Sequence, residues 1–254
     1  MCANNLLKSV PHRTASILFI LLAVMHCSLL AGEGLDQAAG LTSDFRVWLQ
    51  EHDYKRYDFS RPDLGNEGSY GGKLYPQQKL RRDPVIFIHG NSDRALGSGR
   101  LGWDEHIRYF QRAGYTPAEL YATTWGPADL GRAAEQRHAS PYLHRIRAFI
   151  QAVLEYTGTR KVDVVAHSMG VTLARKAIQG GPGFDRDYGR YDLGPSLANR
   201  IDSFVGIAGA NLGLANCSLA RRLPTCNDQD GFYPGGFSWG IPTRRSDFLR
   251  DLPG

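Results

Sequence analysis

The sequence lacks the features that would place it outside the ordinary globular class. It has no internal repeat and no low-complexity tract, and its 254 residues are 42% hydrophobic and 22% charged. Those values argue against a disordered, collagen-like or multi-pass membrane protein. The 30 basic and 25 acidic residues give a net charge of only +5, and the basic residues are scattered. A nucleic-acid-binding surface needs a concentrated basic stripe, so no nucleic-acid partner is expected.

Signals for a cofactor are equally scarce. No cluster of His, Cys, Asp or Glu has the ligand spacing of a metal site. The pattern G-x-G-x-x-G occurs at 97–102, but it begins eight residues after His89 instead of at the end of a strand. A dinucleotide site needs that pattern between a strand and the helix that follows it. The sequence therefore predicts a protein without metal, dinucleotide or other cofactor.

Long apolar runs are confined to the start of the chain. Basic residues precede an uncharged stretch at 14–31, and Ala31 and Gly32 supply small residues for cleavage. A basic start, a short apolar centre and a small-residue exit describe a secretory signal peptide. An uncleaved anchor is the alternative, but the uncharged stretch at 15–30 has 16 residues, fewer than the ~20 that a spanning helix needs. We expect a signal peptide at 1–31, a secreted, extracellular product and no stable transmembrane anchor.

Cysteine is scarce, and its positions favour one disulfide. Cys2 and Cys27 would leave with the signal peptide, so the mature chain keeps Cys217 and Cys226. These two lie nine positions apart in a stretch rich in Gly, Pro and Asn. In an oxidising compartment such a pair favours a small-loop disulfide over two free thiols.

The rest of the chain divides into a polar segment and a patterned domain. Residues 32–82 contain one short helical pattern near 45–49, and we expect them to form an irregular N-terminal extension lying over the domain. From residue 83 the hydrophobic pattern becomes regular. The last stretch, 209–254, has no strong periodicity and is expected to be loop.

Short apolar runs alternate with helical stripes in the domain at 83–254. The runs at 85–88, 162–166 and 201–208 are typical of strands buried on both faces. A clear apolar stripe at helical spacing fills 143–154. Because strands that alternate with helices are joined by crossovers, the pattern predicts an α/β fold, a mostly parallel sheet with helices on both faces.

One serine lies where a nucleophile elbow is expected. An apolar run at 162–165 leads into A-H-S-M-G at 166–170, and a helical pattern follows at once. A strand, a sharp turn and a helix in this order hold the serine hydroxyl exposed above the sheet in a strained turn. This predicts Ser168 as a nucleophile. The Met169 N–H, at the start of the helix, would then donate to the developing oxyanion.

A second oxyanion donor should come from the loop after an earlier strand. The strand at 85–88 is followed by His89, Gly90 and Asn91, and Gly90 allows an acyl group to approach closely. We take the Asn91 N–H as the second donor. His89 is expected to anchor this loop and not to act as a base.

These motifs resemble the secreted α/β-hydrolase lipases of the class 2 type, which are known from nematodes and bacteria. The resemblance covers 83–250 and is carried by I-H-G-N-S-D at 88–93, Y-A-T-T-W-G at 121–126 and V-D-V-V-A-H-S-M-G-V-T at 162–172. It implies an α/β-hydrolase fold and a carboxylic ester hydrolase of lipid catabolism, whose partner is a lipid ester substrate that can lie at a lipid–water interface. It also implies Ser168 as nucleophile.

The sequence departs from the family in its histidines. In the family an Asp and then a His follow the nucleophile, whereas the last of the eight histidines here is His167. A serine hydroxyl needs an imidazole base to take its proton. We therefore expect a hydrolase domain that ends early, with triad acid and base unassigned. Two functions stay open: a serine lipase or esterase, and a catalytically incomplete fragment or pseudoenzyme that acts at most as a lipid-binding protein.

Overall fold

The computed structural model describes residues 39–252, with the exception of residues 98 and 100. The predicted signal peptide at 1–31 lies outside the described residues. Between 39 and 252, the described helices include none with the length and apolar character that crossing a membrane requires.

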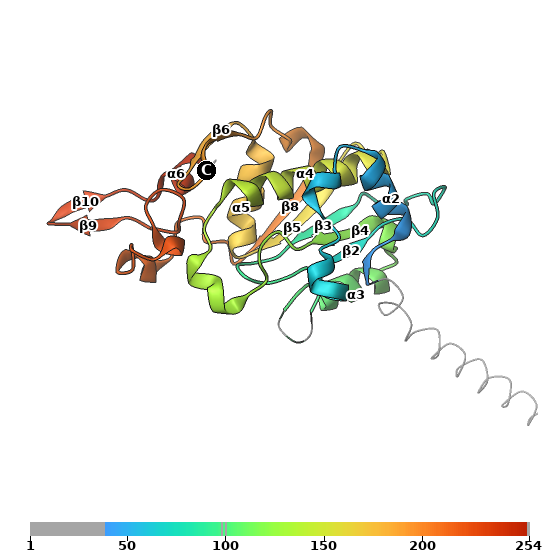
Figure 1. Cartoon of the computed structure of the whole chain (residues 1–254), viewed down its shortest axis with the longest axis horizontal. Coiled ribbons are helices and arrows are strands. Elements are labelled where there is room, and N and C mark those ends of the chain that lie inside the picture. The colour runs from blue at the N-terminus through green and yellow to red at the C-terminus, as the bar shows by residue number, and fades with distance from the viewer. Residues whose placement is uncertain (1–38, 98, 100, 253–254) are drawn as a thin grey trace, which may run out of the picture. The chain divides into compact units, whose positions relative to one another are not determined.

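A six-stranded sheet forms the centre of the described chain (Figure 1). The strand order is β1-β2-β4-β3-β5-β8. Their bounds are Gly40–Leu41 for β1, Ser69–Gly71 for β2, Val85–Ile88 for β3, Leu120–Thr123 for β4, Val162–His167 for β5 and Ile201–Ile207 for β8. Only the β2–β4 pair is antiparallel, and the other neighbours in this sheet are parallel. The prediction of a mostly parallel sheet is confirmed.

Helices cover both faces of this sheet. The α-helices are α2 (Ser43–Glu51), α3 (Asp104–Arg112), α4 (Ser140–Thr157), α5 (Met169–Gln179) and α6 (Asp247–Asp251). Side chains alternate along a strand, and on β3 the two faces meet different helices. Ile86 and Ile88 belong to the main apolar core with α4 and α5, whereas Phe87 contacts Phe110 of α3 at 5.5 Å between ring centroids.

Short elements complete the chain. Two antiparallel hairpins lie outside the main sheet: β6 (Pro182–Asp185) with β7 (Gly189–Asp192), and β9 (Gly236–Ser238) with β10 (Ile241–Thr243). The 3-10 helices are η1 (Lys55–Tyr57), η2 (Pro62–Glu67), η3 (Pro117–Glu119), η4 (Leu130–Glu135), η5 (Ala198–Arg200), η6 (Ala215–Ser218) and η7 (Pro224–Cys226).

The N-terminal segment is more regular than its sequence indicates. The short helix expected near 45–49 is α2, where the Thr42 hydroxyl caps the N–H of Phe45 at 3.3 Å. The same segment also supplies β1 and β2 to the main sheet. These strands have two and three residues, too few for a period-two pattern to be visible in the sequence.

Two expectations for the C-terminal part are corrected. The strand predicted at 201–208 exists as β8, but it is not buried, and Phe204, Val205 and Ile207 are exposed. It is the last strand in the order of the described sheet, with β5 as its neighbour. The stretch 209–254, expected to be loop, contains the β9–β10 hairpin and α6.

Candidate active site

Ser168 lies in a strained turn between β5 and α5. Its backbone has φ 50° and ψ −123°, a conformation that residues with a Cβ rarely adopt. The Ser168 N–H donates to the carbonyl of Ile207 at 2.9 Å, which ties the turn to the end of β8. The α-helix begins at the next residue, Met169. The strand–turn–helix predicted from A-H-S-M-G is therefore present.

Two glycines let the loop after β3 approach this turn. A Cβ on Gly170 would lie 2.3 Å from the His89 carbonyl oxygen, so α5 and the end of β3 approach as closely as they do only because Gly170 has no side chain. A Cβ on Gly90 would lie 3.2 Å from the Cβ of Ser168 and 3.0 Å from Nδ1 of His167. The structure thus brings together Gly90 and Ser168, 78 positions apart in the sequence, and with them the two motifs from which the candidate site was predicted.

The two predicted oxyanion donors are backbone N–H groups that can serve a ligand. The Asn91 side chain is fixed, since its amide donates to Ala133 O at 2.9 Å and accepts from the Ser92 hydroxyl at 3.0 Å. Its backbone N–H has no acceptor among the described residues. The Met169 N–H is in the first turn of α5, where no partner exists within the helix. The positive end of the helix dipole adds to the attraction for an anion.

His89 is a buried, neutral histidine that holds this loop. Its Nδ1 lies 2.8 Å from Gly90 O, and its Nε2 accepts the N–H of Trp125 at 3.0 Å. The two rings stack with centroids 4.8 Å apart. Burial lowers the pKa of His89 to about 3, so it stays uncharged. The expectation that His89 anchors the loop agrees with these contacts, because both ring nitrogens are occupied.

His138 is the other buried histidine close to α5. Its Nδ1 lies 2.7 Å from Asp230 O and its Nε2 2.7 Å from the hydroxyl of Thr172. Burial lowers its pKa to about 3 as well. Thr172 lies about one turn beyond Ser168 on α5, so His138 reaches the helix of the nucleophile but not the serine. No pattern around His138 in the sequence indicated this approach.

No described residue stands as a base on Ser168. Across 39–252, none of the histidine nitrogens is hydrogen-bonded to the Ser168 hydroxyl. Asp163 is also occupied, since its carboxylate accepts the Ser203 N–H at 3.0 Å and burial raises its pKa. In the same described part of the chain, no group of three or more His, Cys, Asp or Glu side chains could hold a metal ion.

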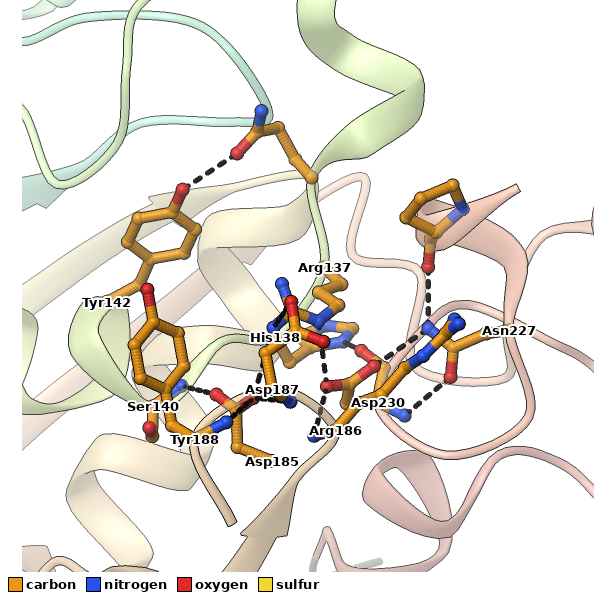
Figure 2. Close-up of polar contacts among 12 residues, drawn as sticks. Arg137, His138, Ser140, Tyr142, Asp185, Arg186, Asp187, Tyr188, Asn227 and Asp230 are labelled. Carbon is orange, nitrogen blue, oxygen red and sulfur yellow. Dashed lines mark hydrogen bonds and ion pairs between the residues drawn. The ribbon is translucent and has the colours of Figure 1, made fainter. Parts of the chain in front are cut away.

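An ionic network around Arg137 joins the start of α4 to the β6–β7 hairpin and the loop at 227–230 (Figure 2). The Arg137 Nη2 lies 3.0 Å from Asp185 and 2.8 Å from Asp187, and its Nε lies 3.1 Å from Asp230. The last contact is an ion pair without hydrogen-bond geometry, because Arg137 Nε has no hydrogen-bond partner. Asp230 also accepts the Asn227 amide at 2.7 Å.

Asp185 is the most heavily bonded carboxylate of this network. Burial alone would raise its pKa, but the N–H groups of Ser140, Asp187 and Tyr188, together with Arg137, outweigh burial and lower it. The network therefore joins the start of α4, the β6–β7 hairpin and the loop at 227–230. Its members are far apart in the sequence, and no spacing pattern could have revealed them.

The predicted disulfide is present. Cys217 and Cys226 are bonded, with their Cα atoms 4.8 Å apart, and both are buried. The bridge links η6 to η7 and closes the loop that precedes Asn227 and Asp230 of the ionic network.

The sequence matches the model of a known protein family. The family model described as lipase (class 2) matches residues 82–253, which is more than half of the chain. Among solved structures, the crystal structure of Aspergillus fumigatus lipase B is similar at 15% sequence identity and a TM-score of 0.42. The match covers 76% of this chain and 38% of that one.

Proposed function

Because this chain belongs to the class 2 lipase family, we propose that it is a secreted carboxylic ester hydrolase that cleaves lipid esters with Ser168 as nucleophile. The observation that carries the proposal is the strained backbone of Ser168 between β5 and α5, at φ 50°. Strain of this kind persists only where the surrounding structure over-determines it, and it concentrates at reactive groups. The mostly parallel sheet with helices on both faces is that of an α/β-hydrolase.

In the proposed reaction Ser168 Oγ forms a bond to the acyl carbon while the N–H groups of Asn91 and Met169 donate to the carbonyl oxygen, which becomes an oxyanion. The bond between the acyl carbon and the alcohol oxygen then breaks. The alcohol leaves with the proton that the serine hydroxyl gave up. Water next attacks the acyl-serine, which releases the fatty acid and restores the Ser168 hydroxyl.

The second candidate function is binding of lipid esters without turnover. One observation favours it: the described residues place both nitrogens of His89 and both nitrogens of His138 on other partners. Without an imidazole to take its proton, a serine is a weak nucleophile at neutral pH.

A fluorophosphonate probe separates the two candidates, since it labels activated serines covalently. The enzyme proposal expects labelling of Ser168, identified by peptide mass spectrometry, together with hydrolysis of a soluble short-chain p-nitrophenyl ester. Ser168→Ala should abolish both, whereas Ser43→Ala, a change at an exposed serine of α2, should alter neither. If Ser168 stays unlabelled in correctly folded protein, the enzyme proposal is wrong. Binding of lipid esters without turnover is then the remaining candidate function.

Gly90→Ala tests the arrangement around the serine. The new methyl would lie 3.2 Å from the Ser168 Cβ, so the loop carrying Asn91 must move away from the nucleophile. Labelling and esterase activity should fall at least about tenfold, as expected when one oxyanion donor is misplaced. Unchanged labelling would mean that this loop does not serve the serine.

Secretion is a separate part of the proposal. It is supported by the signal-like pattern at 1–31 and by the Cys217–Cys226 disulfide, a bond typical of oxidising compartments. Expression of the whole chain in a secreting eukaryotic cell should release protein whose N-terminus, read by mass spectrometry, is Gly32. Protein that stays in the cell and keeps the 1–31 segment would contradict this part alone.

A further inference from the structure

The β9–β10 hairpin carries three large apolar side chains that the described part of the molecule leaves uncovered. The exposed fractions are 77% for Phe237, 99% for Trp239 and 68% for Ile241. In Figure 1 the two strands extend away from the main sheet. Single apolar residues on a surface are ordinary, but three exposed ones within five positions of one projecting hairpin mark an interaction site.

The register of the hairpin shows that no face of it is built to pack on the protein. Phe237 pairs with the position next to Ile241, and side chains alternate along a strand. Phe237 and Ile241 therefore point to opposite faces. Trp239 is at the tip, with φ 52°, followed by Gly240 with φ 79°. Two positive φ values fit a type I′ turn, which favours Asn or Asp over a bulky residue, so turn geometry does not explain the tryptophan.

The base of the hairpin is firmly held. The Tyr233 and Thr243 hydroxyls lie 2.6 Å apart, and the Ser246 N–H donates to Tyr233 O at 3.0 Å. The guanidinium of Arg221 stacks over the Tyr233 ring at 4.5 Å. A tip supported in this way presents its side chains with little further loss of conformational entropy on binding.

Arginines gather in the sequence around this base. Four arginines and two aspartates occur between 219 and 246. Asp230 is buried against Arg137 and Asp228 pairs with Arg221. Among the described ion pairs, none involves Arg244 or Arg245, which directly follow β10. The apolar tip thus adjoins a positively charged neck.

We propose that the β9–β10 hairpin anchors this protein to an anionic lipid–water interface. Trp239, Phe237 and Ile241 enter the boundary between headgroups and acyl chains, and Arg244 and Arg245 face the lipid phosphates. Tryptophan prefers this boundary, and basic residues nearby strengthen attachment to anionic lipid. The positive neck disfavours a second copy of the chain as the occupant, since two such necks would repel each other. The proposal rests on the proposed function, because lipid esters gather at such interfaces.

Vesicle binding by the whole chain tests the anchor. The protein should sediment with vesicles of phosphatidylcholine and phosphatidylglycerol. Binding to them should shift its tryptophan emission to shorter wavelength. That shift reports Trp239, which is 99% exposed, because Trp103 and Trp125 are buried and Trp48 packs partly buried against the core. Phe237→Ser/Trp239→Ser/Ile241→Ser should weaken the partition at least about tenfold. Arg244→Gln/Arg245→Gln should weaken binding roughly fivefold per arginine on anionic vesicles only. Leu74→Ser, which alters an apolar residue between β2 and β3 that is 63% exposed, should change nothing.

The outcomes separate this inference from the catalytic one. Ser168→Ala should bind vesicles like the wild type, and the triple hairpin variant should keep fluorophosphonate labelling and hydrolysis of a soluble ester. The anchor proposal would be contradicted if the wild-type protein does not bind vesicles, or if the triple variant still binds them. It would also be contradicted by a triple variant that changes only the oligomeric state in sedimentation velocity, since the hairpin would then contact a second copy.

Discussion

Replacing Arg137 by methionine should destabilise the fold far more than removing the surface aspartate paired with it. Arg137 Nη2 lies 3.0 Å from Asp185 and 2.8 Å from Asp187, so distance does not distinguish the two ion pairs. Burial does: the Asp185 side chain is 0% exposed and that of Asp187 is 63% exposed. Arg137→Met leaves Asp185 and Asp230 as buried carboxylates without their cation, a change that costs about 3–5 kcal/mol. Asp187→Asn removes a solvated partner and should cost about 0–1 kcal/mol.

Urea unfolding followed by circular dichroism measures both changes. With a slope of about 2 kcal/mol/M, Arg137→Met should lower the midpoint by roughly 1.5–2.5 M, and Asp187→Asn by less than about 0.5 M. Arg132→Met is the matched control, because the ion pair between Arg132 and Glu135 is exposed on both sides. Equal losses for the Arg137 and Asp187 variants would refute the reasoning, since burial would then not decide the strength of the network.

Three further predictions concern other parts of the fold. Gly170→Ala places a methyl 2.3 Å from a backbone oxygen of the β3 end, so it should cost about 1–3 kcal/mol in urea unfolding and reduce labelling of the serine; a stable, fully labelled variant would contradict the close packing. Cys217→Ser/Cys226→Ser removes a disulfide between cysteines nine positions apart and should lower the free energy of unfolding by about 2–3 kcal/mol. Adding reductant to that variant should not lower its stability further. Burial holds the pKa of His89 and of His138 at about 3, below the ~6.5 of the unfolded chain. Their contribution to stability is therefore complete above pH 6.5 and is lost as the pH falls toward 3, by about 1.4 kcal/mol per pH unit and histidine; urea midpoints that do not change between pH 7 and pH 5 would show that these histidines are not buried.

The sequence predicted the central strands well because their signals are local. The buried strands β3 and β5 appear as apolar runs, and α4 appears as a stripe that ends at Gly158, which has a φ of 70° at the end of the helix. In the main sheet the missed strands are β1 and β2, which are too short for a pattern, and the hairpins β6–β7 and β9–β10 were missed as well. Burial of β8 was predicted wrongly because its composition reflects an apolar strand, while its exposure depends on its place at the edge of the sheet.

The candidate site divides in the same way. The motif around Ser168 predicted the sharp turn, and the turn is strained as expected. The sequence also contained the glycine at position 90, but the 3.2 Å approach to Ser168 exists only once β3 and β5 are neighbours in the sheet. The ionic network of Arg137 was invisible, since its members come from three separate segments.

Features that depend on neighbouring residues could be predicted from the sequence alone. These are the alternation of strands and helices, the strained serine, the small-loop disulfide and the resemblance to class 2 lipases, which the family comparison confirms. The tertiary structure decided what depends on distant residues: which strand lies at the edge, which carboxylates share Arg137, and that His138 binds Thr172 and not Ser168. It also decided that Phe237, Trp239 and Ile241 face solvent. The physical reason is that burial and pairing follow from packing, and packing brings together residues that the sequence keeps apart.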